Sequence, residues 1–195
     1  MTGLFRTSDR IDLDDGFHLT MIDRSDATSL VKFLNEEEYQ RQTLSIPFPY
    51  RISDGDIFID QVLKWEAENQ IQRDWAIRDR TSEQIGGIGL LYDHGLTSHK
   101  SSLGYWLAKP YWHQGIMTRV LKTFCSYIFE NRSITRLEAQ VFTQNLASCK
   151  VLEKAGFVRE GTLLKAFKKG DTYIDCYLYA RLAPDIIDKK KDNDV

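Results

Sequence analysis

The chain has 195 residues, of which 42% are hydrophobic, 12% aromatic and 28% charged, a composition typical of one folded globular domain and not of a disordered segment. The net charge is −2 and no basic stripe is present, which argues against nucleic acid as the main partner. No run approaches the ~20 apolar residues of a membrane span, and Met1–Thr7 lacks the apolar core of a secretory signal. We therefore expect no membrane association.

The three cysteines, Cys125, Cys149 and Cys176, are odd in number and far apart. Neither a CxxC pair nor a Cys/His spacing typical of zinc is present, so we expect no metal site. Thiols stay reduced in the cytoplasm. We predict three free, mostly buried thiols in a cytoplasmic protein. Surface positions are expected for three isolated histidines, His18, His94 and His99.

The first predicted elements are a strand and a helix. Alternating apolar and polar residues predict a strand over Phe17–Ile22. Ser25 or Asp26 can cap the helix that follows, and this helix ends near Asn35. Its apolar positions recur at helical spacing: Ala27, Leu30, Val31 and Leu34.

A stiff loop and a longer helix come next. Two prolines within Ile46–Tyr50 exclude a helix there and leave an aromatic-bearing loop. Ser53 and Asp56 resemble a capping pair, which predicts a helix that runs to about Asn69.

Three strands and a loop occupy the middle of the chain. Short apolar runs predict strands over Trp75–Ile77, Ile85–Tyr92 and Leu103–Leu107. A polar connection over 93–100 separates the last two strands. The sequence predicts a loop over Lys109–Gly115.

The C-terminal part predicts two helices and three strands. One apolar face predicts a helix over Met117–Glu130, and alternation predicts a strand over Leu137–Phe142. A short helix over Ala147–Lys154 precedes two strands, Phe157–Leu164 and Thr172–Arg181, joined by a turn at 169–171.

This element order predicts a mixed α/β (α+β) fold in which helices flank a central sheet. The sheet begins antiparallel, but the strand–helix–strand unit from Leu103 to Phe142 requires a parallel pair joined by a right-handed crossover. We expect a single domain over 11–183, an N-terminal extension over 1–10 and a flexible tail over 184–195.

The most informative segment is a strand, a glycine loop and a helix. Unpaired N–H groups at a helix N-terminus attract anions, and Gly115 lets an anion approach the backbone. The segment Gln114–Thr118 could thus hold a phosphate, although a lone glycine before a helix more often marks a simple turn. It is neither a Walker loop nor a dinucleotide fingerprint, and Gly86–Gly89 lies within a predicted strand.

Two segments resemble a known family. They are Tyr105–Leu107 followed by Tyr111–Thr118, and Asn145–Phe157, which has the pattern N-x-x-S-x-x-V-L-x-K-x-G-F. Together they resemble the GCN5-related N-acetyltransferases (GNAT), and more narrowly the RimJ/RimL branch that acetylates ribosomal proteins. The resemblance extends over about 11–182.

The resemblance implies roles for these residues with acetyl-CoA as cofactor. The pyrophosphate of coenzyme A would lie on loop amides, and its pantetheine arm would run beside the strand that ends at Leu107. A backbone N–H near Leu107 would polarise the thioester carbonyl. Asn145 would hold the pantetheine amides, and Ser148 would protonate the departing thiolate. The implied cofactor-binding residues are Tyr105, Trp106, Leu107, Trp112, His113, Gln114, Gly115, Ile116, Met117, Thr118, Asn145 and Ser148.

Some positions depart from the general family pattern. Trp112 and Met117 replace common loop residues, as they do in the RimJ/RimL branch. Leu152 stands where many members carry a tyrosine acid, and Ser102 stands where the branch often has a glutamate. Glu138, Glu160 or water therefore remain as candidate bases. A free α-amine, with a pKa of ~8, needs less help from a base than a lysine or polyamine amine.

The resemblance implies a cytoplasmic N-acetyltransferase whose acceptor is the N-terminal α-amine of a protein, such as a ribosomal protein, and it is compatible with a homodimer. Phe48 and Tyr50 could line the acceptor channel, or could instead fasten their loop to the core. The alternatives are an acetyltransferase for a polyamine, aminoglycoside or amino acid, and a non-catalytic acyl-CoA-binding module.

Overall fold

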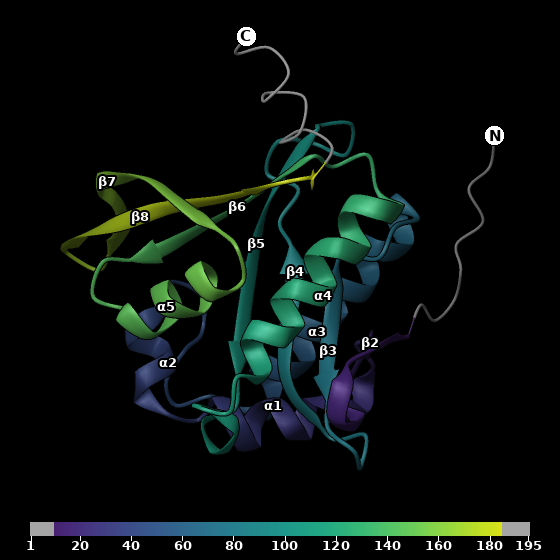
Figure 1. The fold of residues 1–195 in the computed structure, drawn as a ribbon. Helices are drawn as coiled ribbons and strands as arrows, with labels where there is room; N and C mark the ends of the chain where they lie inside the picture. Colours follow the sequence, from purple (N-terminus) through teal and green to yellow (C-terminus); the bar gives the residue numbers. More distant parts are fainter. Residues whose placement is uncertain (1–9, 185–195) are drawn as a thin grey trace, which may run out of the picture. The chain divides into compact units, whose positions relative to one another are not determined.

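The computed structural model describes residues 10–184 (Figure 1). Apart from Arg10 and Pro184, the expected extension 1–10 and tail 184–195 lie outside the described residues. The described chain clusters into two compact units. The first comprises 10–89 and 105–116, and the second comprises 90–104 and 117–184.

The strands of the first unit form an antiparallel sheet in the order β1-β2-β3-β4. The strands are β1 (Ile11–Asp12), β2 (His18–Met21), β3 (Asp74–Arg78) and β4 (Gln84–Leu90). The three longer strands confirm the predicted ones, whereas the two-residue β1 was not predicted. The antiparallel start of the sheet is also confirmed.

The helices of the first unit correct several predicted boundaries. They are the 3₁₀ turns η1 (Asp14–Gly16) and η2 (Arg24–Asp26), and the helices α1 (Ala27–Leu34), α2 (Glu37–Gln42) and α3 (Ile52–Asn69). Helix α2 was not predicted. The capping pair at Ser53 was placed two residues too late, because α3 begins at Ile52 and Asp54 accepts a hydrogen bond from the Arg51 N–H at 2.7 Å.

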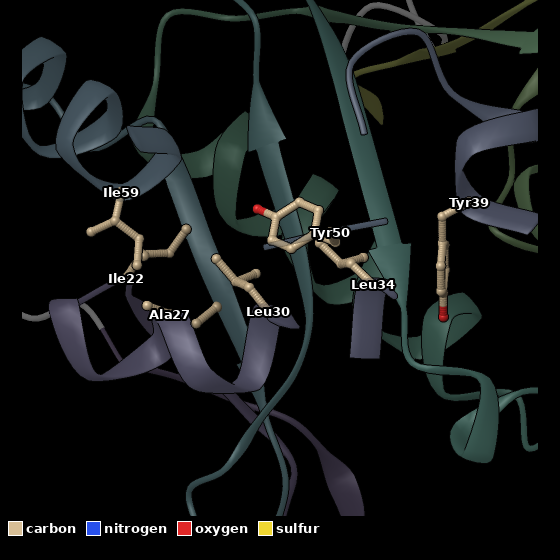
Figure 2. Packing of buried hydrophobic residues seen from close by; sticks show 8 residues of the cluster. Ile22, Ala27, Leu30, Leu34, Tyr39, Tyr50 and Ile59 are labelled. Atoms are coloured by element: carbon tan, nitrogen blue, oxygen red, sulfur yellow. The ribbon is translucent and has the colours of Figure 1, made fainter. Parts of the chain in front are cut away.

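The core of the first unit joins α1 to the loop before α3 (Figure 2). Leu30 and Leu34 are buried, as the helical spacing predicted. Truncating a leucine packed in this way costs about 2–5 kcal/mol of stability. The cluster consists of Ile22, Ala27, Leu30, Leu34, Tyr39, Tyr50, Ile59 and Ala76.

A buried ion pair fixes the start of α1 to β3. Asp26 occupies the N-cap position, as one predicted alternative had it, but its side chain does not cap the helix. Its carboxylate, in a residue that is 3% exposed, instead accepts bonds of 2.7 and 2.9 Å from Arg78. His18 lies on β2, paired with Asp12 on one side and Arg78 on the other, and is 4% exposed. The surface position expected for His18 was therefore wrong.

The second unit contains the crossover. Its strands lie in the order β5-β6-β8-β7, with β5 parallel to β6 and the other pairs antiparallel. Helix α4 connects β5 to β6 in sequence (Figure 1), which confirms the parallel pair that the sequence required. The elements are β5 (Lys100–Leu107, whose last three residues belong to the first unit), α4 (Ile116–Asn131), β6 (Arg136–Phe142), α5 (Leu146–Lys154), β7 (Val158–Lys169) and β8 (Thr172–Leu182).

The hairpin of β7 and β8 is longer than predicted. Strand β7 continues to Lys169 instead of ending near Leu164. Its register with β8 is irregular between Leu163 and Phe167, where Lys165 has a φ of 51° and its N–H donates to Asp175 at 2.7 Å. Leu164 is exposed, so this part of β7 lacks the apolar pattern of a half-buried strand.

The strands and helices of the two units together confirm the predicted mixed α/β class.

Candidate functional site

The end of β5 is anchored through a backbone carbonyl. The carbonyl oxygen of Leu107 accepts hydrogen bonds from the Tyr39 hydroxyl at 2.9 Å and from the Trp112 indole N–H at 2.6 Å. The Tyr39 ring also makes edge-to-face contacts with Trp106 and Trp112. Burial raises the pKa of Tyr39, so its hydroxyl keeps its proton and remains a donor.

The glycines of β4 allow this part of β5 to approach closely. A Cβ on Gly86 would stand 2.7 Å from the Trp106 carbonyl oxygen, and one on Gly87 would stand 2.7 Å from the Trp106 indole nitrogen. The Ala108 N–H donates to the Ile85 carbonyl at 2.7 Å. The glycine run therefore serves strand packing, which agrees with its predicted place in a strand.

The loop after β5 begins with the 3₁₀ turn η3 (Lys109–Tyr111). The Tyr111 hydroxyl donates to the Asp79 carboxylate at 3.0 Å, and its ring makes edge-to-face contacts with Phe17 and Phe33. Asp79 also accepts hydrogen bonds from its own turn, including the Thr81 N–H at 2.8 Å. Tyr111 thus fastens the start of the loop to the sheet of the first unit.

The glycine loop itself is exposed and has an unusual backbone. His113 has a φ of 62° and Gly115 a φ of 71°, so two left-handed residues alternate with their neighbours. Left-handed residues also occur in the backbone concavities that bind anions in other proteins. His113, Gln114 and Gly115 are exposed, and α4 begins at the next residue, Ile116.

The side chains at the start of α4 have different surroundings. Ile116 and Met117 are buried, so within the predicted cofactor-binding set they can offer only backbone groups. Thr118 is half-buried. The apolar face predicted for this helix is confirmed by the buried residues Val120, Leu121, Phe124 and Ile128.

The second motif forms the start of α5 in the second unit. Asn145 is the N-cap residue, and its side-chain oxygen accepts the Ser148 N–H at 3.1 Å. Both residues are half-buried. Leu152, at the position of the absent tyrosine, is buried in the core.

The two predicted carboxylate bases belong to one ion-pair network. Glu138 is buried and accepts hydrogen bonds from Arg136 at 2.7 Å and Lys100 at 3.3 Å. Burial opposes its ionisation, but hydrogen bonds from Arg136 and Lys100 outweigh that effect and hold the pKa of Glu138 below its usual value. Glu160 is exposed and is held by both terminal nitrogens of Arg136, one of them at 2.9 Å.

The two predicted acceptor-site residues of the aromatic loop differ in their exposure to solvent. Phe48 is 47% exposed, whereas Tyr50 is 5% exposed and packs in the core cluster. The Tyr50 N–H donates to the Asn35 side chain at 3.2 Å. Of the two, only Phe48 presents a side chain at the surface, and Tyr50 has the core-fastening role that was its alternative.

Among residues 10–184, no group of histidines, cysteines and acidic residues could hold a metal ion. The three cysteines are free and buried. No helix in the described part of the chain is long and apolar enough to cross a membrane.

Strand β5 thus leads through a loop with two left-handed residues to the N-terminus of α4, and helix N-termini bind anionic ligands in many proteins. The sequence profile of the acetyltransferase (GNAT) domain family matches residues 17–158. The chain belongs to this family, and the match includes residues of both units.

Several curated proteins are similar in sequence. The uncharacterized N-acetyltransferase YoaA of Bacillus subtilis is 34% identical over 113 residues, which cover 56% of this chain and 62% of that protein. The probable N-acetyltransferase YjcK of the same organism is 40% identical over 83 residues, covering 43% of this chain and 46% of YjcK. The chain thus spans about three fifths of the length of YoaA and under half of the length of YjcK. The putative ribosomal N-acetyltransferase YdaF, also from Bacillus subtilis, is 25% identical and covers 85% of this chain and 91% of YdaF.

Solved structures share the fold. RimL, a ribosomal L7/L12 alpha-N-protein acetyltransferase in complex with coenzyme A, superposes with a TM-score of 0.78 at 19% identity and covers 89% of this chain and 98% of RimL. The microcin C7 self-immunity acetyltransferase MccE, in complex with acetyl-CoA and AMP, has a TM-score of 0.78 at 20% identity and covers 87% of this chain and 94% of MccE.

Proposed function

We propose that this chain is an acetyl-CoA-dependent N-acetyltransferase. Membership of the GNAT family over 17–158 is the observation that carries the proposal. The exposed loop of left-handed residues before α4 supports it, because a diphosphate needs backbone N–H groups that it can reach. The three reduced thiols agree with a cytoplasmic enzyme.

The residues present fit the cofactor's anionic part. The amides of the loop His113–Thr118 would hold the pyrophosphate, since this loop is exposed at 113–115 and leads into the N-terminus of α4. Tyr105, Trp106 and Leu107 would bind the pantetheine arm along β5 through their backbone, and Asn145 would bind it through its side-chain amide. When bound, acetyl-CoA supplies an activated thioester.

Ser148 and Leu107 are the proposed catalytic residues. In the transfer, the bond between the amine nitrogen and the acetyl carbon forms and the carbon–sulfur bond breaks. The Leu107 N–H stabilises the oxyanion between these events. The Ser148 hydroxyl gives its proton to the departing sulfur. The amine loses its proton to water, and water returns a proton to the Ser148 oxygen.

Water is the proposed acceptor of the amine proton. Glu138 is already paired with two cations, and its lowered pKa makes it a weak base. Glu160 is likewise occupied by Arg136. A water relay suits an α-amine, whose pKa of ~8 leaves a fraction of the amine neutral at physiological pH.

The acceptor we favour is the N-terminal α-amine of a protein, as in the RimJ/RimL branch. The names of YdaF, a putative ribosomal N-acetyltransferase, and of RimL support this choice. The similarity to MccE, whose structure holds AMP, supports a small-molecule amine as the second candidate.

The direct test follows coenzyme A release with acetyl-CoA and a panel of N-terminal peptides, polyamines, aminoglycosides and amino acids. Release with peptides alone supports the favoured acceptor, and release with small amines alone supports the second candidate. Tight acetyl-CoA binding without release for any amine would refute catalysis and indicate an acyl-CoA-binding module.

The role of Ser148 has its own test. Ser148→Ala should lower kcat by on the order of 100-fold, the usual contribution of a general acid. Ser126→Ala is a matched control, because Ser126 is an exposed serine on α4. Equal loss in both variants, or no loss in Ser148→Ala, contradicts the proposed proton transfer.

A further inference from the structure

A carboxylate that does not belong to the sequence motifs is fixed against β5. The loop that follows β4 is attached to β5 at consecutive residues. The Leu91 N–H donates to the Ser102 carbonyl at 2.8 Å, and the Tyr92 N–H donates to the Ser101 hydroxyl at 3.2 Å. Asp93 then accepts the Ser102 hydroxyl at 2.7 Å and the Ser102 N–H at 3.3 Å.

The backbone is strained where it presents this carboxylate. Tyr92 has a φ of 48°, which a bulky residue rarely adopts and which costs on the order of 1 kcal/mol or more. The bonds to Ser101 and Ser102 hold the loop in this conformation. Asp93 is therefore positioned in advance and does not swing freely on a surface loop.

Asp93 differs electrostatically from its acidic neighbours in the second unit. Glu138 and Glu160 are neutralised by arginine or lysine. Within the described part of the chain, no lysine or arginine forms an ion pair with Asp93. The Nε2 atom of His94 lies 3.7 Å from Oδ2 of Asp93, and this contact is ionic only when His94 is protonated. The Asp93 side chain is 41% exposed, so its charge is open to a ligand.

The charge of Asp93 is stable at neutral pH. Burial opposes ionisation, but hydrogen bonds from Ser102 and the charge of His94 outweigh it and hold the pKa of Asp93 below its usual value. A carboxyl of this kind binds a cation well and accepts a proton poorly. It suits a counter-ion better than a general base.

Open space lies on the same strand. Residues at alternate positions of a strand face the same side, so Ser102 and Gly104 share one face of β5. Gly104 is exposed, and a Cβ built on it would meet nothing within 4 Å. The parallel ladder with β6 covers only Lys100–Ser102 and Arg136–Glu138, so it ends before Gly104. A glycine inside a strand marks a bulge, a bend, or a place where a ligand or another backbone comes close, and no other backbone lies near Gly104 where a Cβ would stand.

We propose that Asp93, held by Ser102, binds the ammonium group of the acceptor amine in the space beside Gly104. This proposal rests on the proposed acetyltransferase function and assigns the acceptor's charged end to a residue outside the family motifs. Asp93 is a substrate-binding residue in this role. The ammonium is held by Asp93, and the proton that it loses before attack goes to water.

Steady-state kinetics of Asp93→Asn test the proposal. The acceptor KM should rise about tenfold or more, the typical effect of losing a charge-assisted hydrogen bond, while the dissociation constant of acetyl-CoA stays within about twofold of wild type. Asp93→Glu should restore part of the loss. Asp171→Asn is the matched control, because Asp171 lies exposed in the turn between β7 and β8.

A binding measurement decides the question without turnover. Calorimetry on the coenzyme A complex compares n-butylammonium with neutral n-butanol. Wild-type protein should prefer the ammonium, and Asp93→Asn should lose that preference. An unchanged KM in Asp93→Asn, or equal preferences in both proteins, overturns the assignment. Absence of acetylated product with every amine refutes the proposed function instead, and the binding preference still decides the role of Asp93.

Discussion

Removing both donors to the Leu107 carbonyl should cost more than the two single removals together. Trp112→Phe deletes the indole N–H at 2.6 Å, and Tyr39→Phe deletes the hydroxyl at 2.9 Å. Each hydrogen bond contributes about 1 kcal/mol net, so each single variant should lose about that much stability. The remaining donor still satisfies the buried carbonyl in either single variant.

The double variant leaves that carbonyl without either side-chain donor. An unsatisfied buried acceptor costs about 1–3 kcal/mol beyond the lost bonds, so we expect a total of about 3–5 kcal/mol and a coupling of about 1–3 kcal/mol. Urea denaturation, monitored by circular dichroism, measures the free energy of unfolding of the wild type, the two single variants and the double variant. Tyr173→Phe is the control, because Tyr173 is an exposed tyrosine. Additivity within about 0.3 kcal/mol would refute the shared-acceptor reasoning.

Three further substitutions probe other contacts. Gly87→Ala should cost about 1–3 kcal/mol by thermal melting, because its Cβ would stand 2.7 Å from the Trp106 indole nitrogen; an unchanged Tm contradicts this. Asp26→Asn should lower the free energy of unfolding, measured in urea, by about 3–5 kcal/mol, because it leaves Arg78 charged and buried. A loss under about 1 kcal/mol, the value of a surface ion pair, would show that water reaches the pair. The lowered pKa of Glu138 means that its charge stabilises the fold above its unfolded pKa of ~4.3 and that this gain disappears as pH falls through the folded value. Glu138→Gln should therefore reduce the drop in Tm between about pH 5 and pH 3, and a drop as steep as in wild type would refute the assignment.

Periodicity predicted the elements that bury one continuous face. Helix α4 was found because its apolar residues recur at helical spacing. Helix α2 was missed because Glu37–Gln42 contains one apolar residue, Tyr39, and is held by contacts to β5 and not by an apolar stripe of its own. Strand β1 has two residues, too few for any alternation to appear.

The candidate site was only partly predictable for a similar reason. A glycine before a helix predicts an anion loop from local sequence, and the structure gives Gly115 a left-handed φ of 71° just before α4. The sequence does not reveal that His113 adopts a left-handed φ, because a non-glycine residue rarely does so and its local sequence carries no signal for it. The burial of Tyr50 depends on residues distant in sequence, because its side chain packs in the core cluster with residues of α1 and α3.

The choice among carboxylates shows most clearly what the three-dimensional structure adds. Sequence alone ranks Glu138 above Asp93, since Glu138 alternates along a predicted strand and Asp93 lies in a polar connection. The fold reverses that order, because Arg136 and Lys100 occupy Glu138 whereas Ser102 holds Asp93 without neutralising it. The partner of Asp93, Ser102, is uncharged, and the Ser102 hydroxyl holds a carboxylate from nine residues earlier in the chain against β5. The strand therefore has a negative charge beside it that its own sequence does not contain.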